Sequence, residues 1–266
     1  MRPAEQTDLI WGRHPVDEAL RSGRAVKRLY LARGLRPAEG LAQTLALAQE
    51  RGVIIEEMDR SHLDLLTGTS RHQGIAARVS PLPPADVQDI LDLAARRQEP
   101  PLILALDSVQ DPQNLGTLLR TAEAVGAHGV ILPKHRAAGI TGAVVKASAG
   151  AAQWLTVAEV TNLVRALREL KEKGVWVMGL DMEGTIAYDE VDASLPLVLV
   201  VGSESRGLGR LVREQCDFVA RLPMRGHVES LNAAVAGSIV LYQLWRQRDR
   251  GQLPINGKSG EQPGAD

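Results

Sequence analysis

From residue 101 onward, short apolar segments alternate with amphipathic ones, and this alternation restricts the possible folds more than any other feature. The predicted strands are residues 102–106, 129–132, 175–180 and 197–201. The predicted helices are residues 115–125, 143–149, 161–173 and 231–246. Strands that are apolar at every position are buried on both faces. The pattern therefore predicts an α/β domain with a mostly parallel sheet and helices on both sides.

The first part of the chain predicts a smaller α/β unit. Its predicted helices and strands are residues 16–20, 26–31, 40–51, 53–56 and 74–79. The stretch SPLPPAD at 80–86 then places three prolines where neither a helix nor a central strand can continue. We therefore expect a domain at 1–79, a linker at 80–85, a second domain at 86–248 that opens with a helix at 86–97, and a flexible polar tail at 249–266.

Composition restricts the possible functions. The chain is 44% hydrophobic and 24% charged, which is typical of a soluble globular protein. Aromatic residues make up only 3%, which argues against single-strand binding on stacked aromatic platforms. The net charge of −1 means that any nucleic-acid site must be a local basic patch. Because Cys216 is the single cysteine, we expect a buried filler residue, no disulfide and no thiolate metal cluster.

The sequence also predicts a cellular compartment. No apolar run is long enough to span a membrane, and the first residues lack the apolar core of a signal peptide. One thiol in 266 residues suits a reducing compartment. We expect a cytoplasmic protein with no membrane contact and no bound metal.

Three loops lie where ligands bind in an open parallel sheet, beyond the carboxyl ends of its strands. In the first, Asn114 is expected to cap a helix, and Arg120 to be a solvated charge on another face of it. The second, VVGSESRGLG at 200–209, has neither the G-x-S-x-G spacing of a serine hydrolase nor a dinucleotide-binding fingerprint. In the third, Ser230 is expected to cap the last helix and Asn232 to be exposed in its first turn.

Taken together, the order and spacing of the three loops resemble the SpoU (TrmH-like) 2′-O-ribose methyltransferases. The shared patterns are N-x-G-x-x-x-R-[ST]-A, G-x-E-x-x-G-[LM] and [LI]-P-M-x-G-x-x-x-S-L-N. The matching residues are Asn114, Gly116, Arg120, Thr121, Ala122, Gly202, Glu204, Gly207, Leu208, Leu222, Pro223, Met224, Gly226, Ser230, Leu231 and Asn232. The segments 11–23 and 71–79 resemble the two ends of an L30e-like RNA-binding module found in one branch of this family.

The resemblance implies a fold, a cofactor and an assembly. The second domain is expected to contain the deep trefoil knot of the SPOUT class, which base rates alone would argue against. The expected cofactor is S-adenosylmethionine, and the expected assembly is a homodimer with its active sites at the interface. The residues expected to bind the cofactor are Gly179, Leu180, Gly202, Leu222, Met224 and Leu231.

The resemblance also implies a catalytic set, Arg120, Asn114, Glu204, Ser230 and Asn232. The family proposal makes the arginine the base, but a guanidinium is effectively always protonated. We expect Arg120 to hold an RNA phosphate and stabilise the developing alkoxide, while phosphate or water takes the proton. Glu204 would orient Arg120 or the ribose, supported by Asn114. Ser230 and Asn232 would face the reacting centre from a helix N-terminus. Either subunit could supply Arg120.

The leading prediction is methylation of a guanosine ribose in 23S ribosomal RNA. The alternatives are a tRNA ribose, a ribosomal site linked to antibiotic resistance, and a non-catalytic assembly factor that binds RNA. The basic run Arg21, Arg24, Lys27, Arg28, Arg33 and Arg36 is either an RNA footprint or a solvated face. A second basic set, expected just past a strand end, is Lys134, His135, Arg136 and Lys146. We expect His227 to be peripheral.

Overall fold

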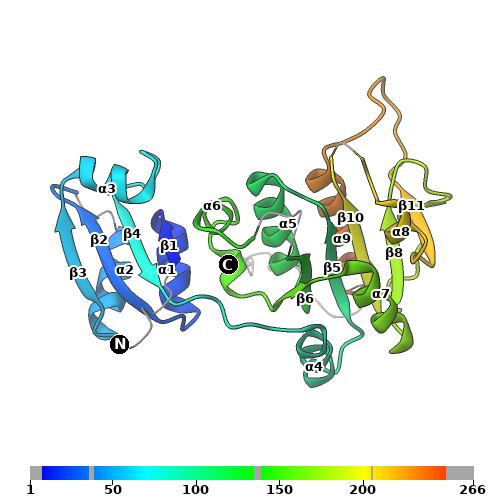
Figure 1. The fold of residues 1–266 in the computed structure, drawn as a ribbon, viewed down its shortest axis with the longest axis horizontal. Helices are drawn as coiled ribbons and strands as arrows, with labels where there is room; N and C mark the ends of the chain where they lie inside the picture. Colours follow the sequence, from blue (N-terminus) through cyan, green and yellow to red (C-terminus); the bar gives the residue numbers. More distant parts are fainter. Residues whose placement is uncertain (1–7, 36–38, 135–138, 205, 250–266) are drawn as a thin grey trace, which may run out of the picture.

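The computed structural model describes residues 8–35, 39–134, 139–204 and 206–249, which form two sheets (Figure 1). The first has the order β1-β4-β2-β3, in which only β2 and β3 pair in parallel. Its strands are β1 (Asp8–Trp11), β2 (Val26–Ala32), β3 (Ile54–Met58) and β4 (Ile75–Val79). The helices packed around it are α1 (Arg13–Arg21), α2 (Glu39–Glu50) and α3 (Arg60–Thr67). The mixed α/β character predicted for this region is confirmed.

The second sheet has the order β7-β6-β5-β10-β8-β11-β9, and every neighbouring pair is parallel. Its strands are β5 (Leu102–Asp107), β6 (Gly129–Pro133), β7 (Val157–Val160), β8 (Trp176–Leu180), β9 (Ile186–Ala187), β10 (Leu197–Gly202) and β11 (Phe218–Arg221). All carboxyl ends therefore lie at one edge. The short strands β7, β9 and β11 were not predicted, because so few residues give no readable periodicity.

Helices cover both faces of this sheet, as the continuously apolar strands predicted. Leu102, Leu104 and Leu106 share one core with residues of α5 and α9, whereas Ile103 and Ala105 share the other with α4 and α7. The helices are α4 (Val87–Arg97), α5 (Pro112–Ala124), α6 (Gly142–Ala147), α7 (Leu163–Glu172), α8 (Arg210–Arg213), α9 (Ala233–Arg248) and the 3₁₀ turn η1 (Ala151–Gln153). No helix in the described ranges could cross a membrane.

Two predicted helix caps are wrong. Asp111, not Asn114, caps α5: its carboxylate accepts the N–H of Gln113 at 3.1 Å, and a proline at the first helical position suits the fixed φ of that residue. Asn232, not Ser230, caps α9, accepting the N–H groups of Ala234 and Val235 at 2.9 and 3.2 Å. Asn114 is thereby moved into a first turn, and Ser230 into the preceding loop.

The two sheets meet along a seam between β1 and α1 on one side and α6 and η1 on the other (Figure 1). Gly142 allows this approach, since a Cβ there would lie 2.2 Å from the carbonyl oxygen of Leu9. Across the seam the amide of Gln153 donates to the carbonyl of Pro15 at 2.9 Å, and the Trp154 indole donates to Glu18 at 2.8 Å. The seam therefore fixes one unit against the other. The predicted domain limits and the trefoil knot stay predictions.

Candidate active site

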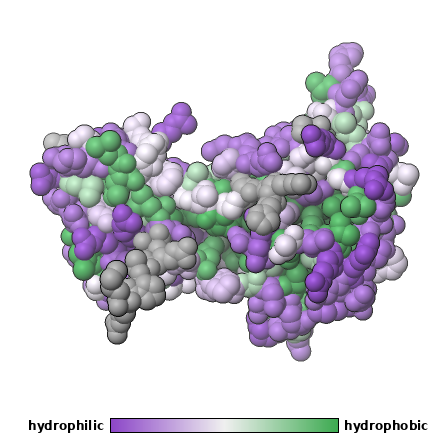
Figure 2. Space-filling model, viewed as in Figure 1, coloured by the Kyte–Doolittle hydropathy of each residue, from purple (hydrophilic) through white to green (hydrophobic). Residues whose placement is uncertain are grey.

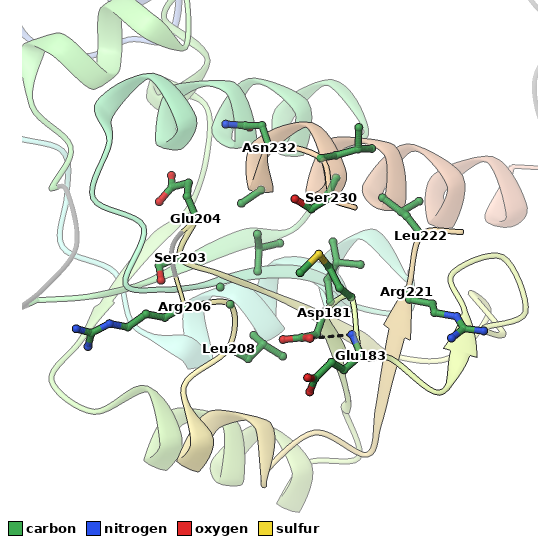
Figure 3. Close-up of a pocket in the computed structure, with 18 of the residues that line it drawn as sticks. Asp181, Glu183, Ser203, Glu204, Arg206, Leu208, Arg221, Leu222, Ser230 and Asn232 are labelled. Atoms are coloured by element: carbon green, nitrogen blue, oxygen red, sulfur yellow. Dashed lines mark hydrogen bonds between the residues drawn. The ribbon is translucent and has the colours of Figure 1, made fainter. Parts of the chain in front are cut away.

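A cavity of about 1210 Å³ lies at the carboxyl edge of the larger sheet, beyond β8, β10 and β11 (Figure 3). The loops after these strands form its walls, as expected for a ligand site in a parallel sheet. It is lined by residues 180–183, 201–204, 206–208, 210, 213, 221–224, 229–233 and 236. Its position brings the second and third motif loops together.

The loop after β10 is folded tightly onto itself. Ser203 and Gly207 exchange two backbone hydrogen bonds, at 3.0 and 3.1 Å. A Cβ on Gly202 would lie 2.2 Å from the carbonyl carbon of Gly207, so this turn requires glycine there. The Asp107 carboxylate then accepts the N–H of Gly209 at 2.7 Å. The turn leaves Ser203 and Glu204 at the cavity (Figure 3).

The loop at 222–231 forms the opposite wall. Its backbone makes no hydrogen bond to any other backbone group in the described ranges. Because the loop is largely exposed, its N–H and C=O groups are open to water or a ligand. Leu222, Met224, Ser230 and Leu231 contribute to the lining, whereas His227 is exposed and does not.

A chain of hydrogen bonds joins all three motif loops. The Asn232 carbonyl oxygen caps α9, so its amide nitrogen is free to donate to the Asn114 side-chain oxygen at 3.0 Å. The amide nitrogen of Asn114 in turn donates to the carboxylate of Glu204. Each carboxamide thus has one defined orientation, imposed by the helix cap. These contacts explain why an asparagine occupies the first turn of α5 and another the start of α9.

An acidic wall of the cavity was missed by the sequence analysis. Asp181 and Glu183 follow β8, and Arg213 of α8 lies 3.3 and 3.4 Å from their carboxylates. The Asp181 carboxylate also accepts the Glu183 N–H at 3.0 Å (Figure 3). The signal that could have found Asp181 is its place directly after a buried strand, where ligands bind in a parallel sheet.

The predicted site residues divide into three groups. Those that line the cavity are Leu180, Gly202, Glu204, Leu222, Met224, Ser230, Leu231 and Asn232. Gly179 lies beneath it, where a Cβ would be 2.7 Å from the side chain of Leu208, and Asn114 contacts two lining residues. Arg120 does not line it: the side chain is exposed on α5 and forms no ion pair in the described part of the chain.

Two other expectations about reactive groups can be assessed. Cys216 is partly buried beneath Gly179, and burial, the largest cause, raises the pKa of its thiol to about 11. A thiol with so high a pKa stays protonated and is a poor nucleophile, which agrees with a packing role. Among the described residues, no three His, Cys, Asp or Glu side chains gather as metal ligands would.

The first basic run is largely neutralised by carboxylates. Arg21, Arg24, Arg28 and Arg33 pair with Asp17, Asp8, Glu56 and Asp59 at 2.6–3.2 Å. Arg36, His135 and Arg136 lie outside the described residues. Lys134 is exposed after β6, as expected, but Lys146 is not past a strand end: it lies in the seam, because α6 packs against β1. The run at 21–36 is therefore a poor candidate for an unopposed RNA-binding patch.

Comparison with known proteins agrees with this geometry. The pattern of the SpoU rRNA Methylase family matches residues 101–242, and that of the RNA 2′-O ribose methyltransferase substrate-binding domain matches residues 9–85. The chain belongs to the SpoU family of RNA methyltransferases. It is 43% identical to YacO of Bacillus subtilis, which is named as a TrmH family tRNA/rRNA methyltransferase, over 92% of this chain and 98% of that protein. A tRNA/rRNA methyltransferase of Mycobacterium avium is 45% identical over 93% and 81%.

Solved structures of SpoU proteins share the fold. AviRb from Streptomyces viridochromogenes, crystallised with AdoMet (S-adenosylmethionine), aligns with a TM-score of 0.75 and 27% identity over 91% of both chains. An rRNA methyltransferase of Sinorhizobium meliloti, also with AdoMet, has a TM-score of 0.73 and 27% identity over 93% of this chain and 88% of that one. The A. aeolicus TrmH/SpoU tRNA modifying enzyme, at 30% identity and a TM-score of 0.52, covers only 61% of this chain and 84% of its own.

Proposed function

We propose that this SpoU protein transfers a methyl group from S-adenosylmethionine to the ribose 2′-hydroxyl of a guanosine in 23S ribosomal RNA. The observation that carries the proposal is the cavity at the carboxyl edge, with the Asn232–Asn114–Glu204 hydrogen-bond chain at its side. The three motif loops of the family thus meet at one place. The volume of about 1210 Å³ exceeds that of an ordinary small-molecule pocket, which leaves room for a target nucleotide beside a cofactor.

The lining residues suit an adenosine-containing cofactor. Leu208, Leu222 and Leu231 offer apolar walls for a base, and the open backbone groups of 222–231 offer donors and acceptors for its edge. Asp181 and Glu183, which share Arg213 as their ion-pair partner, offer carboxylate oxygens that can accept hydrogen bonds from a ligand. When bound, the cofactor would supply an electrophilic methyl group on a sulfonium. These side chains and backbone groups would hold and orient it.

The transfer forms a bond between the ribose O2′ and the methyl carbon and breaks the bond between that carbon and sulfur. The hydroxyl proton leaves to an RNA phosphate or to water. Glu204, oriented by Asn114, is placed to accept a hydrogen bond from the incoming ribose. Ser230 lines the same cavity and can bind the target nucleotide. Arg120 would stabilise the developing alkoxide as a fixed cation.

The exposure of Arg120 supports a homodimer in which the partner subunit completes the site. The neighbouring face of α9 is apolar and uncovered: Val235, Ile239 and Tyr242 are 45, 38 and 53% exposed. This face continues onto α5, where the hydroxyls of Thr121 and Ser238 lie 2.8 Å apart. A second copy packed on this face would remove apolar surface from water and bring its own Arg120 toward the cavity of the first.

Ribosomal RNA is favoured over tRNA because of the first domain. The A. aeolicus tRNA modifying enzyme covers only 61% of this chain, whereas the matched rRNA methyltransferase of Sinorhizobium meliloti covers 93% of it. A separate RNA-binding unit suits a folded target site, which proteins recognise by shape and by the 2′-hydroxyl. A tRNA substrate is the second candidate, because an enzyme named as tRNA modifying also matches part of this chain.

The test is to map alkali-resistant ribose positions in total RNA from a strain without this gene and from the same strain complemented with the wild type. We expect one guanosine of 23S ribosomal RNA to lose its 2′-O-methyl group. A mark lost from tRNA instead would overturn the rRNA assignment and keep the chemistry. If no mark is lost, and the purified protein binds S-adenosylmethionine without turnover on any RNA, the protein is a non-catalytic assembly factor and the proposal is wrong.

A further inference from the structure

The seam between the two units contains two basic side chains that the proposed chemistry does not use. Arg13 begins α1 in the first unit, and Lys146 lies near the end of α6 in the second. The backbone N–H of Arg13 and the amine of Lys146 donate to the same side-chain oxygen, that of Gln73, at 3.0 and 2.9 Å. Residues far apart in sequence thus converge on one atom.

The local backbone makes this convergence possible. The φ of Gly12 is +101°, a conformation that favours glycine, and a Cβ there would lie 2.4 Å from the present position of the Lys146 amine. Gln73 itself has φ +59°, a strained conformation for a residue with a side chain. The strained turn therefore places this side-chain oxygen between the backbone N–H of Arg13 and the amine of Lys146.

A buried histidine holds the strained turn in place. The Nδ1 atom of His72 accepts the N–H of Gly74 at 2.9 Å, so the proton of the neutral ring is on Nε2, which donates to Asp64 at 2.8 Å. His72 is fully buried, and both ring nitrogens are satisfied. The turn at 72–74 is thus positioned before any ligand arrives, which lowers the entropic cost of binding one.

Neither cation has a counter-charge among the residues that the structure describes. Among the described residues, Arg13 and Lys146 form no ion pair with a carboxylate, and the Nε–H of Arg13 is buried without an acceptor. By contrast, the nearby arginines Arg21 and Arg24 are paired with carboxylates at 2.7 and 2.6 Å. Burial lowers the pKa of the Lys146 amine, since nothing negative offsets its desolvation. A partly buried cation without a counter-charge is stabilised when an anion binds to it.

The helix that carries Lys146 also packs against α5, the helix that carries Asn114. Lys146 is followed by Ala147, which packs on α5 so closely that a Cβ on Gly116 would be 2.4 Å from the Ala147 Cβ. Gly116 lies two residues after Asn114 on α5. The helix α6 lies between the two lobes (Figure 1), and the molecular surface is hollowed between these lobes on the side from which the 222–230 loop projects (Figure 2).

We propose that the seam is an RNA phosphate site, in which Lys146 and the guanidinium of Arg13 hold one backbone phosphate of the substrate while its target nucleotide occupies the cavity. One contact comes from each unit. The site therefore selects RNA in which the element held by the first unit lies at a set distance from the methylated nucleotide. It rests on the proposed function only in that the ligand is RNA. Phosphate contacts of this kind position a nucleic acid without reading its sequence.

The test uses Lys146→Gln, Arg13→Gln and Arg13→Lys in the full-length protein, with 23S ribosomal RNA from a strain that lacks this gene as the probe. Binding is measured from about 50 to 200 mM salt, where each lost phosphate contact reduces the log–log slope by about one unit or slightly less. We expect both glutamine variants to bind about 5- to 10-fold more weakly with a shallower slope, and Arg13→Lys to stay near the wild type. Binding of S-adenosylmethionine should not change.

The matched control is Lys173→Gln. It removes the same charge from a lysine that pairs with Glu169 before β8, at the opposite edge of the sheet, and should leave RNA binding unchanged. If Lys146→Gln lowers the melting temperature but leaves the salt slope at the wild-type value, the seam is a structural joint and the inference is wrong. If the wild type itself neither binds nor methylates the RNA, the proposed function has failed instead. If the control weakens binding equally, the effect is general charge and the inference is again wrong.

Discussion

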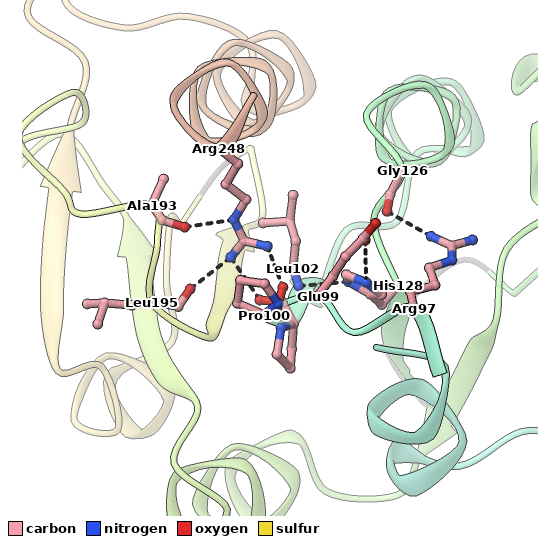
Figure 4. Close-up of polar contacts among 10 residues, drawn as sticks. Arg97, Glu99, Pro100, Leu102, Gly126, His128, Ala193, Leu195 and Arg248 are labelled. Atoms are coloured by element: carbon pink, nitrogen blue, oxygen red, sulfur yellow. Dashed lines mark hydrogen bonds and ion pairs between the residues drawn. The ribbon is translucent and has the colours of Figure 1, made fainter. Parts of the chain in front are cut away.

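The two edges of the larger sheet use polar groups in opposite ways. At the amino edge, Arg248 at the end of α9 donates to the carbonyl oxygens of Ala193, Leu195, Pro101 and Pro100 at 2.5–2.9 Å (Figure 4). These carbonyls precede β5 and β10, so one guanidinium joins the last helix to the starts of two central strands. Burial lowers the pKa of this guanidinium to about 10, and the carbonyl contacts compensate for its lost hydration.

A buried histidine makes further hydrogen bonds at this edge. His128 is only 2% exposed, and its Nδ1 accepts the N–H of Leu102 at 3.0 Å. Its Nε2 then carries the proton and donates to Glu99 at 3.0 Å (Figure 4). Every polar group of this cluster thus has a protein partner, which is what a purely structural edge requires.

The carboxyl edge leaves its polar groups partly unused. Within the described part of the chain, the backbone of 222–231 pairs with no other backbone group, and Glu204 accepts one hydrogen bond although a carboxylate can accept several. Ser230 lines an open cavity. The comparison indicates that polar groups at the amino edge serve stability, whereas those at the carboxyl edge serve activity. Substitutions at the amino edge should lower the free energy of unfolding without altering methyl transfer, and those at the carboxyl edge should lower methyl transfer with less effect on stability.

The largest effect is expected from Arg120→Ala. Loss of the cation that stabilises the alkoxide should lower methyl transfer by about 10²-fold or more. The affinity for S-adenosylmethionine, measured by calorimetry, should stay near that of the wild type, because Arg120 does not line the cavity. A collapse of cofactor binding would contradict this assignment.

Mixed dimers would show which subunit supplies the arginine. Arg120→Ala and Glu204→Gln, each nearly inactive alone, should recover activity when co-assembled if Arg120 acts on the partner's cavity, since one site then has both wild-type groups. The controls are the Arg120→Ala homodimer and the Glu204→Gln homodimer, each taken through the same co-assembly procedure. If co-assembly restores nothing, the two residues act within one chain.

Arg248→Met should break the other edge. Four carbonyl oxygens lose their donor, and the free energy of unfolding should fall by about 2–4 kcal/mol. Urea denaturation measures this, and the specific activity of the folded fraction should not change. Arg246→Met is the control, since that side chain is exposed and lies 3.9 Å from Asp249, and should change stability by less than about 0.5 kcal/mol.

Asn232 connects stability with activity, because it caps α9 and also orients Asn114. Asn232→Ala should cost about 1 kcal/mol in unfolding free energy and also lower methyl transfer. Asn232→Asp keeps the oxygen that caps the helix but loses the amide that donates to Asn114. It should be nearly as stable as the wild type and still be impaired in turnover. Equal activity of Asn232→Asp and wild type would show that the hydrogen-bond chain has no role.

The smallest effect is a pH dependence at His128. Burial, the largest cause, lowers the pKa of this imidazole, so the folded state disfavours its protonation. The stability that it contributes is present above the ordinary pKa of about 6.5 and is lost as the pH falls through the lower folded value. His128→Gln should flatten the decline of unfolding free energy on that acid side. His62→Gln, at an exposed position on α3, should not.

The sequence determined the parallel sheet and the location of its ligand site. Continuously apolar strands separated by amphipathic helices leave only a sheet covered on both faces. The motif spacing placed Asn114, Glu204, Ser230 and Asn232 in the segments that follow strands at its carboxyl edge. These features depend on local periodicity and on short-range order along the chain. They can therefore be read without knowing which strands are neighbours.

The tertiary structure decided the caps, the acidic wall and the seam. Whether Ser230 or Asn232 caps α9 depends on which oxygen the fold turns toward the helix, and both residue types are good caps. Asp181 reaches the cavity only because β8 lies between β10 and β11, and Lys146 meets Gln73 only because two sheets pack together. Such contacts join residues that are distant in the chain, and no local pattern encodes which distant partners will meet.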